Sequence, residues 1–186
     1  MKSIPRNANP TPESPARSAP PGWVDSSNFA EQNGIKAGST ATPQLERLES
    51  SLDGDPGTVN WRFTGRSGRL ADGTVQRWLS LTADLDAQMT CSRCDEPAPV
   101  AVSLAREFLL VADERRAELL DDEAEDYDVL VDDRRFSLTD LLEDECLMAL
   151  PSFVSHPDCR PVQAEAEPEP ARNPFAALAQ WRNPEK

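Results

Sequence analysis

The hydrophobic pattern along the chain changes its period several times, and each period predicts a different element. In residues 59–64 apolar and polar side chains alternate, which is typical of a half-buried strand. Residues 75–89 are rich in β-branched and long apolar side chains and predict one bent strand or two. Alternation resumes at residues 100–111. Together these segments predict an antiparallel β-sheet.

The clearest helical pattern covers residues 137–150. Ser137 stands where its hydroxyl can cap the first turn, and Pro151 ends the helix because it cannot continue the backbone hydrogen bonding. The acidic residues 143–145 are expected to face water. An apolar stripe at helical spacing is expected to face the core and consists of Leu138, Leu141, Leu142, Cys146, Ala149 and Leu150.

A shorter helix is predicted for residues 43–52, where Pro43 takes the first helical position. The turn-forming residues 53–57 end this helix, and residues 67–68 and 72–73 indicate tight connections between strands. Its core-facing residues are expected to be Leu45, Leu48 and Leu52.

Residues 113–133 are strongly acidic. Such a run is usually a solvated loop whose charges repel one another, and a docking surface for a basic partner is the alternative. A short apolar run at residues 127–131 predicts an edge strand at the end of this segment.

The two ends of the chain differ in composition from its middle. Residues 1–21 are rich in Pro and Ser and cannot bury enough apolar area to fold, so a disordered tail is expected. Residues 162–186 combine an acidic, Pro-rich linker with a short amphipathic helix of the kind that docks into a partner's groove. Between them, residues 22–161 predict one α+β domain, an antiparallel sheet with a few packed helices. The proposed docking residues are Asn173, Pro174, Phe175, Leu178 and Trp181.

The formal net charge of −14 argues against loose, sequence-independent binding to nucleic acid, which needs clustered Lys and Arg. Any contact with RNA would be local or would pass through another protein. The strand-rich half is less acidic than the segment after Asp113, so one of its faces could meet phosphate. Ordinary solvated arginines are the alternative. The candidates for contact with RNA or a partner are Arg62, Arg66, Arg69, Arg77 and Arg93.

Composition also bears on the compartment. No apolar run approaches the roughly 20 residues that span a bilayer, and the N-terminus lacks the apolar middle of a secretory signal. The four cysteines are few for a secreted disulfide scaffold. We therefore expect a cytoplasmic protein with reduced thiols and no membrane contact.

Two pairs of potential metal ligands share one spacing. Cys91 and Cys94 form a C-x-x-C pair, and His156 and Cys159 form an H-x-x-C pair that includes the chain's only histidine. These are the four soft ligands of a tetrahedral zinc, which would be structural because no coordination position would stay open. Inert thiols remain an alternative, as does redox chemistry at the C-x-x-C pair. Cys146 lies on the apolar stripe and is expected to be a core residue.

No catalytic residue is indicated. The sequence has no G-x-S-x-G elbow, no Gly-rich phosphate loop and no zinc-deaminase signature. Nothing marks the carboxylates of the acidic run as buried, which would be needed to tune their pKa values. We expect a protein that is not an enzyme.

Four motifs follow one another along the chain. They are C-x-R-C-x-E-P at residues 91–97, L-x-E-D-E-C-L-M-A-L-P at 141–151, H-x-x-C at 156–159 and N-P-F-A-A-L-A-Q at 173–180. This order resembles the bacterial YceD family, and the resemblance extends from about Pro21 to the C-terminus. The sequence departs from the family's usual pattern at Cys146, where an aliphatic residue is typical, and in its Pro- and Ser-rich N-terminal extension.

The resemblance implies a role in the accumulation of large-subunit ribosomal RNA, and hence in ribosome biogenesis. The leading hypothesis is a non-enzymatic factor that supports the synthesis, processing or accumulation of this RNA, with the RNA or a precursor ribosomal particle as its partner. One alternative is an acidic adaptor that binds a basic ribosomal protein. A C-x-x-C thiol oxidoreductase is another.

Overall fold

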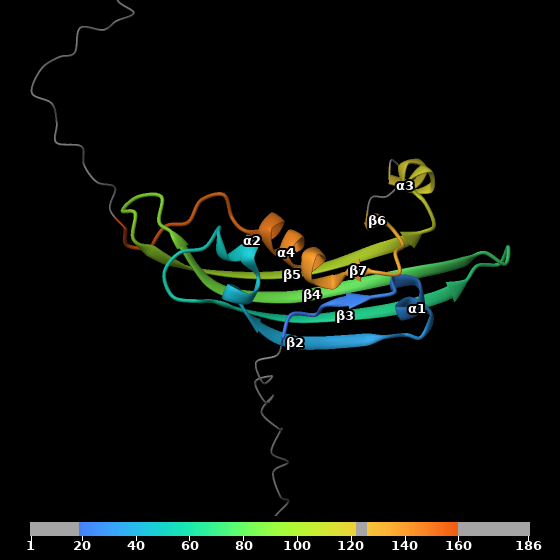
Figure 1. The fold of residues 1–186 in the computed structure, drawn as a ribbon. Helices are drawn as coiled ribbons and strands as arrows, with labels where there is room; N and C mark the ends of the chain where they lie inside the picture. The colour runs from blue at the N-terminus through green and yellow to red at the C-terminus, as the bar shows by residue number, and fades with distance from the viewer. Residues whose placement is uncertain (1–18, 122–125, 160–186) are drawn as a thin grey trace, which may run out of the picture.

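The computed structural model describes residues 19–121 and 126–159. Its main feature is one long sheet with helices over one face (Figure 1). The strands of this sheet follow one another in space as they do in sequence. They are β2 (Ile35–Ala41), β3 (Thr58–Arg69), β4 (Val75–Thr90), β5 (Pro97–Val111) and β6 (Asp128–Val131).

The first four strands of the sheet are antiparallel neighbours. The sequence predicts this arrangement for β3, β4 and β5. The last pair differs, because β6 runs parallel to β5 and pairs only with Phe108–Val111. A parallel partner needs a crossover connection, and the chain makes it through helix α3 (Glu114–Asp121). The acidic segment is therefore partly helical, where the sequence predicts a loop, and its short apolar run forms the predicted edge strand.

Alternation along the strands buries one face of the sheet. Phe63, Leu81 and Leu85 are fully or almost fully buried, whereas Arg62 and Thr82 on the opposite face are exposed. Directly paired residues share a face, so Phe63 on β3 and Leu81 on β4 belong to the same layer. The predicted half-buried strand at residues 59–64 is confirmed.

Helix α4 (Leu138–Ala149) lies over the buried face and is the predicted helix (Figure 1). The Ser137 hydroxyl accepts a hydrogen bond from the backbone N–H of Asp140 at 3.1 Å, which caps the first turn. Leu138, Leu142 and Cys146 are fully buried against the sheet. The predicted burial of the stripe is therefore confirmed from Leu138 to Cys146, whereas Ala149 and Leu150 at its end are half-buried.

The expectation that residues 143–145 face water is wrong for Glu143 and Glu145, which are only 5% and 3% exposed. Glu143 accepts hydrogen bonds from the backbone N–H groups of Arg47 and Leu48. Glu145 pairs with Arg106 on β5 at 2.9 Å. Both carboxylates are buried because distant segments supply their donors.

The remaining elements surround this layer. The helix predicted for residues 43–52 is divided into a 3-10 turn, η1 (Thr42–Gln44), and a short helix, α2 (Glu46–Glu49), because the backbone at Leu45 leaves the helical region at φ −124°. The connection predicted at residues 67–68 is instead part of β3, where both residues pair with β4. The elements that the sequence did not indicate are β1 (Trp23–Val24), α1 (Ser26–Glu31), β2 and β7 (Phe136–Ser137).

Most of the predicted tail, and all of the linker and the docking helix, lie outside the described residues, so the predicted domain boundaries stay predictions. The α+β class is confirmed. Within the described ranges, none of the helices is long and apolar enough to cross a membrane.

Candidate metal centre

The structure brings together the four predicted metal ligands, although 62 residues separate Cys94 from His156 in the sequence. Cys91 and Cys94 lie in the turn between β4 and β5, and His156 and Cys159 lie in the segment after α4. Their ligand atoms are all within 4.8 Å of one another. Such a group could hold one metal ion.

The β4–β5 turn places its two sulfurs through backbone hydrogen bonds. The Cys91 N–H donates to the Glu96 carbonyl at 2.9 Å, and the Asp95 N–H donates back to the Cys91 carbonyl at 3.0 Å. Asp95 adopts a positive φ of 60°, a conformation that Asp tolerates better than most residues do. The chain therefore turns tightly around the C-x-x-C pair.

The second pair arrives on residues 151–159, which we call the strap. Pro151 ends α4 and releases the chain toward the β4–β5 turn. There the Val154 carbonyl accepts a hydrogen bond from the Ser92 N–H at 2.9 Å. The Arg93 guanidinium donates to the Cys159 carbonyl at 3.0 Å. One main-chain bond and one side-chain bond thus join the strap to the turn, in addition to the cluster.

The hydrogen bonds of His156 indicate its tautomer. Its Nε2 lies 3.0 Å from the Pro97 carbonyl, which can only accept, so Nε2 carries a proton. In the neutral ring Nδ1 is then unprotonated, and it lies 3.5 Å from the Cys94 sulfur. A carbonyl behind the second ring nitrogen is the usual support of a metal-binding histidine.

Two separations between ligand atoms, Cys91 to Cys159 and Cys94 to His156, fit a tetrahedral metal. The sulfurs of Cys91 and Cys159 are 3.8 Å apart, far beyond the length of about 2.05 Å of a disulfide bond. Zinc–sulfur bonds of about 2.3 Å at tetrahedral angles place two sulfurs about 3.8 Å apart. The same geometry with a zinc–nitrogen bond of about 2.05 Å gives about 3.6 Å from sulfur to nitrogen. Three thiols and one imidazole are a common donor set for structural zinc.

The thiols of the cluster have unequal acidities. Burial acts to raise the pKa of Cys91, but backbone hydrogen bonds from Arg93, His156 and Cys94 lower it to about 6. Burial raises the pKa of Cys159 to about 11, and hydrogen bonding to the neighbouring sulfurs adds to this shift. Cys91 is therefore largely a thiolate at neutral pH, which is the form that binds metal.

Cys146 takes no part in the cluster. It is fully buried in the hydrophobic core, and burial raises the pKa of its thiol to about 12. The prediction that it is a core residue is confirmed.

The five arginines proposed for RNA or partner contact do not share one surface. Arg62 and Arg66 lie on the solvent-facing side of β3, because they alternate with the buried Trp61 and Phe63. Arg69 lies at the end of β3 and donates to the Gly73 carbonyl.

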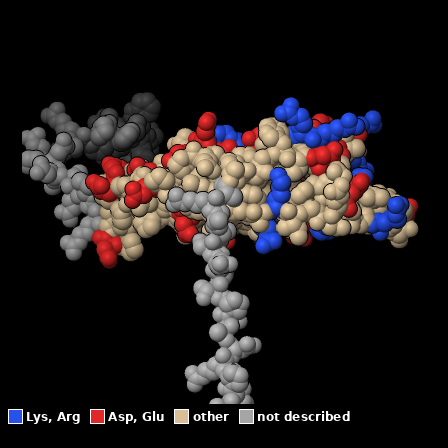
Figure 2. All heavy atoms as spheres, turned by 60° about the horizontal axis from the view of Figure 1, so that its bottom comes forward, with Lys and Arg blue, Asp and Glu red and all other residues tan. Residues whose placement is uncertain are grey.

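The other two arginines lie elsewhere. Arg77 is on the opposite face of the sheet, where it bonds to Glu31 of α1. Arg93 is in the β4–β5 turn at the other end of the sheet. Figure 2 shows the basic side chains mostly over the half with the β3–β4 hairpin, whereas acidic side chains lie over both halves of this face.

The sequence did not indicate the groups that hold the ligands in place by hydrogen bonds. The Pro97 carbonyl, the Ser92 N–H and the Arg93 side chain each bond to the strap. Pro97 follows the C-x-x-C pair by three residues, but the type of residue at this position does not predict that its backbone carbonyl accepts a hydrogen bond from His156. Only the folded backbone shows this role.

A family model described as "Large ribosomal RNA subunit accumulation protein YceD" matches residues 79–181, which is more than half of the chain. The chain belongs to the YceD family. The matched region runs from β4 through α4 and includes all four residues of the cluster and the predicted C-terminal docking helix. No curated protein and no solved structure matches the chain.

Proposed function

We propose that this YceD-family protein supports the synthesis, processing or accumulation of large-subunit ribosomal RNA without catalysing a reaction. The observation that carries the proposal is the family match over residues 79–181. Its partner would be the RNA itself or a precursor ribosomal particle in the cytoplasm. The net charge of −14 favours contact through a protein of the particle over extended contact with phosphates.

The proposed role is tested in a strain that lacks the protein. We expect large-subunit RNA and mature large subunits to fall relative to small subunits, and the wild-type gene to restore both. Normal ratios of the two RNAs and a normal sedimentation profile in the deletion strain would contradict the role.

We further propose that Cys91, Cys94, His156 and Cys159 hold one structural zinc ion. The donor set and the separations of the ligand atoms support this assignment. With four protein ligands the ion keeps no open position for a substrate, so it would hold the strap against the β4–β5 turn. X-ray absorption at the zinc edge should give three sulfur neighbours and one nitrogen. A first shell made of oxygen atoms would contradict the assignment.

A further inference from the structure

Most of β5 has a neighbouring strand on one side only. β4 pairs with it from Pro97 to Leu110, whereas β6 pairs only with Phe108–Val111. Among the described residues, no backbone group bonds to the open side of residues 98–106. Such an edge presents unpaired N–H and C=O groups to which an extended segment can add as a new strand.

Two hydrogen bonds establish which residues turn their backbone groups to this open side. The Val111 carbonyl accepts from the Asp132 N–H on the β6 side, and the Pro97 carbonyl accepts from His156. The register with β4 is continuous between them, and backbone groups alternate sides along a strand, so the odd-numbered residues face outward. Pro99 has no N–H to offer. The residues that present both groups are Ala101, Ser103 and Ala105. Glu107 offers only its N–H, because the parallel register with β6 assigns its carbonyl to the Asp128 N–H.

The side chains at the open edge are small enough to leave the carboxylates of the neighbouring strand, β4, accessible from the edge. Ala101 and Ser103 are small and exposed, and they pair with Asp86 and Asp84 of β4, which are exposed on the same face. A long cationic side chain on an added strand would reach across the small residues to these carboxylates. The solvent face of the edge therefore favours Lys or Arg in a partner.

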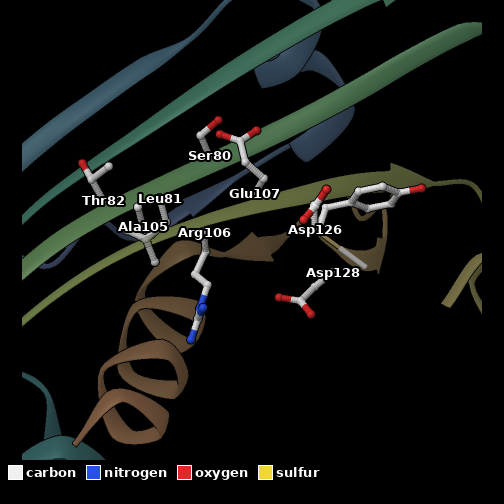
Figure 3. A pocket seen from close by; sticks show the side chains of 9 residues that line it. Ser80, Leu81, Thr82, Ala105, Arg106, Glu107, Asp126 and Asp128 are labelled. Carbon is white, nitrogen blue, oxygen red and sulfur yellow. The ribbon is translucent and has the colours of Figure 1, made fainter. Parts of the chain in front are cut away.

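A hollow of about 450 Å³ lies at the far end of the open edge, between β5 and the chain that leads into β6. Figure 3 shows Arg106 and Glu107 on opposite sides of β5, with Asp126 and Asp128 across the hollow. Both aspartates are exposed and add negative charge where an incoming strand would end.

The inner side of the edge has a different character. Arg106 is neutralised there by Glu145 of α4. Met148 lies nearly one turn further along the same side of α4 and is 67% exposed. An inward-facing residue of an added strand could meet this apolar side chain, since every second residue of that strand faces inward. The required partner thus alternates basic and apolar positions.

The opposite edge of the sheet is less suited to strand addition. β2 has seven residues and carries Lys36, whose ammonium group bonds to the Pro21 carbonyl. Charged side chains of this kind commonly protect sheet edges. The β5 edge has no lysine, and its prolines restrict only its first residues.

We propose that Ala101–Glu107 of β5 binds an extended segment of a basic partner protein by strand addition. The segment places Lys or Arg toward Asp84, Asp86, Asp126 and Asp128, and apolar side chains toward Met148. This inference rests on the proposed function in one respect, namely that the basic partner belongs to a precursor ribosomal particle.

The test uses the purified full-length protein and a capped heptapeptide of alternating Lys and Val. Residue-resolved amide exchange should slow at Ala101, Ser103, Ala105 and Glu107 when the peptide is added. The even-numbered amides, which β4 already pairs, should not change. N-methylation of the peptide amides that face β5 should weaken binding about tenfold or more, because charge is kept while donors are lost.

Two variants separate charge from fold. The double substitution Asp84→Asn with Asp86→Asn should weaken binding roughly three- to tenfold. The control Glu118→Gln on α3 should leave binding unchanged. Unchanged exchange at the four amides, equal binding of the N-methylated peptide, or protection of the same amides by a uridine heptanucleotide instead would overturn the proposal. The assay contains no ribosomal particle, so its failure would leave the RNA role standing.

Discussion

Helix α4 and the strap that follows it are held against the sheet by different interactions. The apolar layer holds α4, whereas the four-residue cluster at the β4–β5 turn includes two residues of the strap. The layer acts through buried area, which is not directional and is shared among many side chains. The cluster depends on four atoms within 4.8 Å of one another. Cys146 belongs to the first region and Cys94 to the second. We therefore expect the layer to determine the fold, and a metal ion in the cluster to determine where the chain runs after Pro151.

The largest effect should follow from opening the apolar layer. Phe63→Ala removes a fully buried ring and should lower the free energy of unfolding by about 3–5 kcal/mol, measured by urea denaturation. The control Phe153→Ala removes a ring that is 83% exposed and should change it by no more than about 0.5 kcal/mol. Equal costs for the two substitutions would refute the distinction between layer and strap.

A smaller loss of unfolding free energy is expected when the buried carboxylate of Glu143, which joins α4 to α2, is changed. Glu143→Gln weakens a buried acceptor of two backbone N–H groups and should cost about 1–3 kcal/mol in the same denaturation experiment. The neighbouring Asp144 pairs with Arg47 at the surface, so Asp144→Asn should cost about 0–1 kcal/mol. A larger cost for Asp144→Asn would show that the buried bonds of Glu143 matter little.

Removal of metal should act locally. A chelator should speed amide exchange at Ser92, whose N–H bonds to the strap, about tenfold or more, because the strap is then free to open. The α4 amides should keep their protection, since the core buries that helix. Global unfolding on chelation would mean that the cluster, and not the layer, holds the fold.

The retention of zinc should depend on pH in a direction set by the thiols. Backbone hydrogen bonds outweigh burial and lower the pKa of Cys91 to about 6. In the metal-free protein its thiolate therefore persists at neutral pH and is protonated as the pH falls through about 6, so below that pH protons compete with zinc for this sulfur. Zinc release followed with a coloured chelator should rise as the pH falls below about 6. Release that is constant between pH 8 and pH 5 would contradict this assignment of the thiolate.

Periodicity was enough to predict the elements that carry the layer. Alternation around Phe63 and the stripe through Cys146 each depend on neighbours within one element. Equal spacing of the two ligand pairs likewise predicted the cluster. β2 was missed because its sequence, IKAGSTA, has few large apolar residues to mark a period. The burial of Glu143 and Glu145 could not be predicted, because Arg47 is 96 residues from the first and Arg106 is 39 from the second.

The open edge of β5 was also beyond sequence reasoning. It exists because β6 has only four residues and covers only the end of a strand of fifteen. The lengths of two strands must be known together before an unpaired stretch can be recognised.

The most direct test of the account is the zinc content of three purified full-length proteins, measured by elemental mass spectrometry. The wild type should contain one zinc per chain, Cys94→Ser should contain none while keeping its far-ultraviolet circular dichroism, and Cys146→Ser should keep one zinc while losing stability. Zinc-free wild type, or full zinc in Cys94→Ser, would contradict the division between a buried layer that makes the fold and a metal cluster that places the strap.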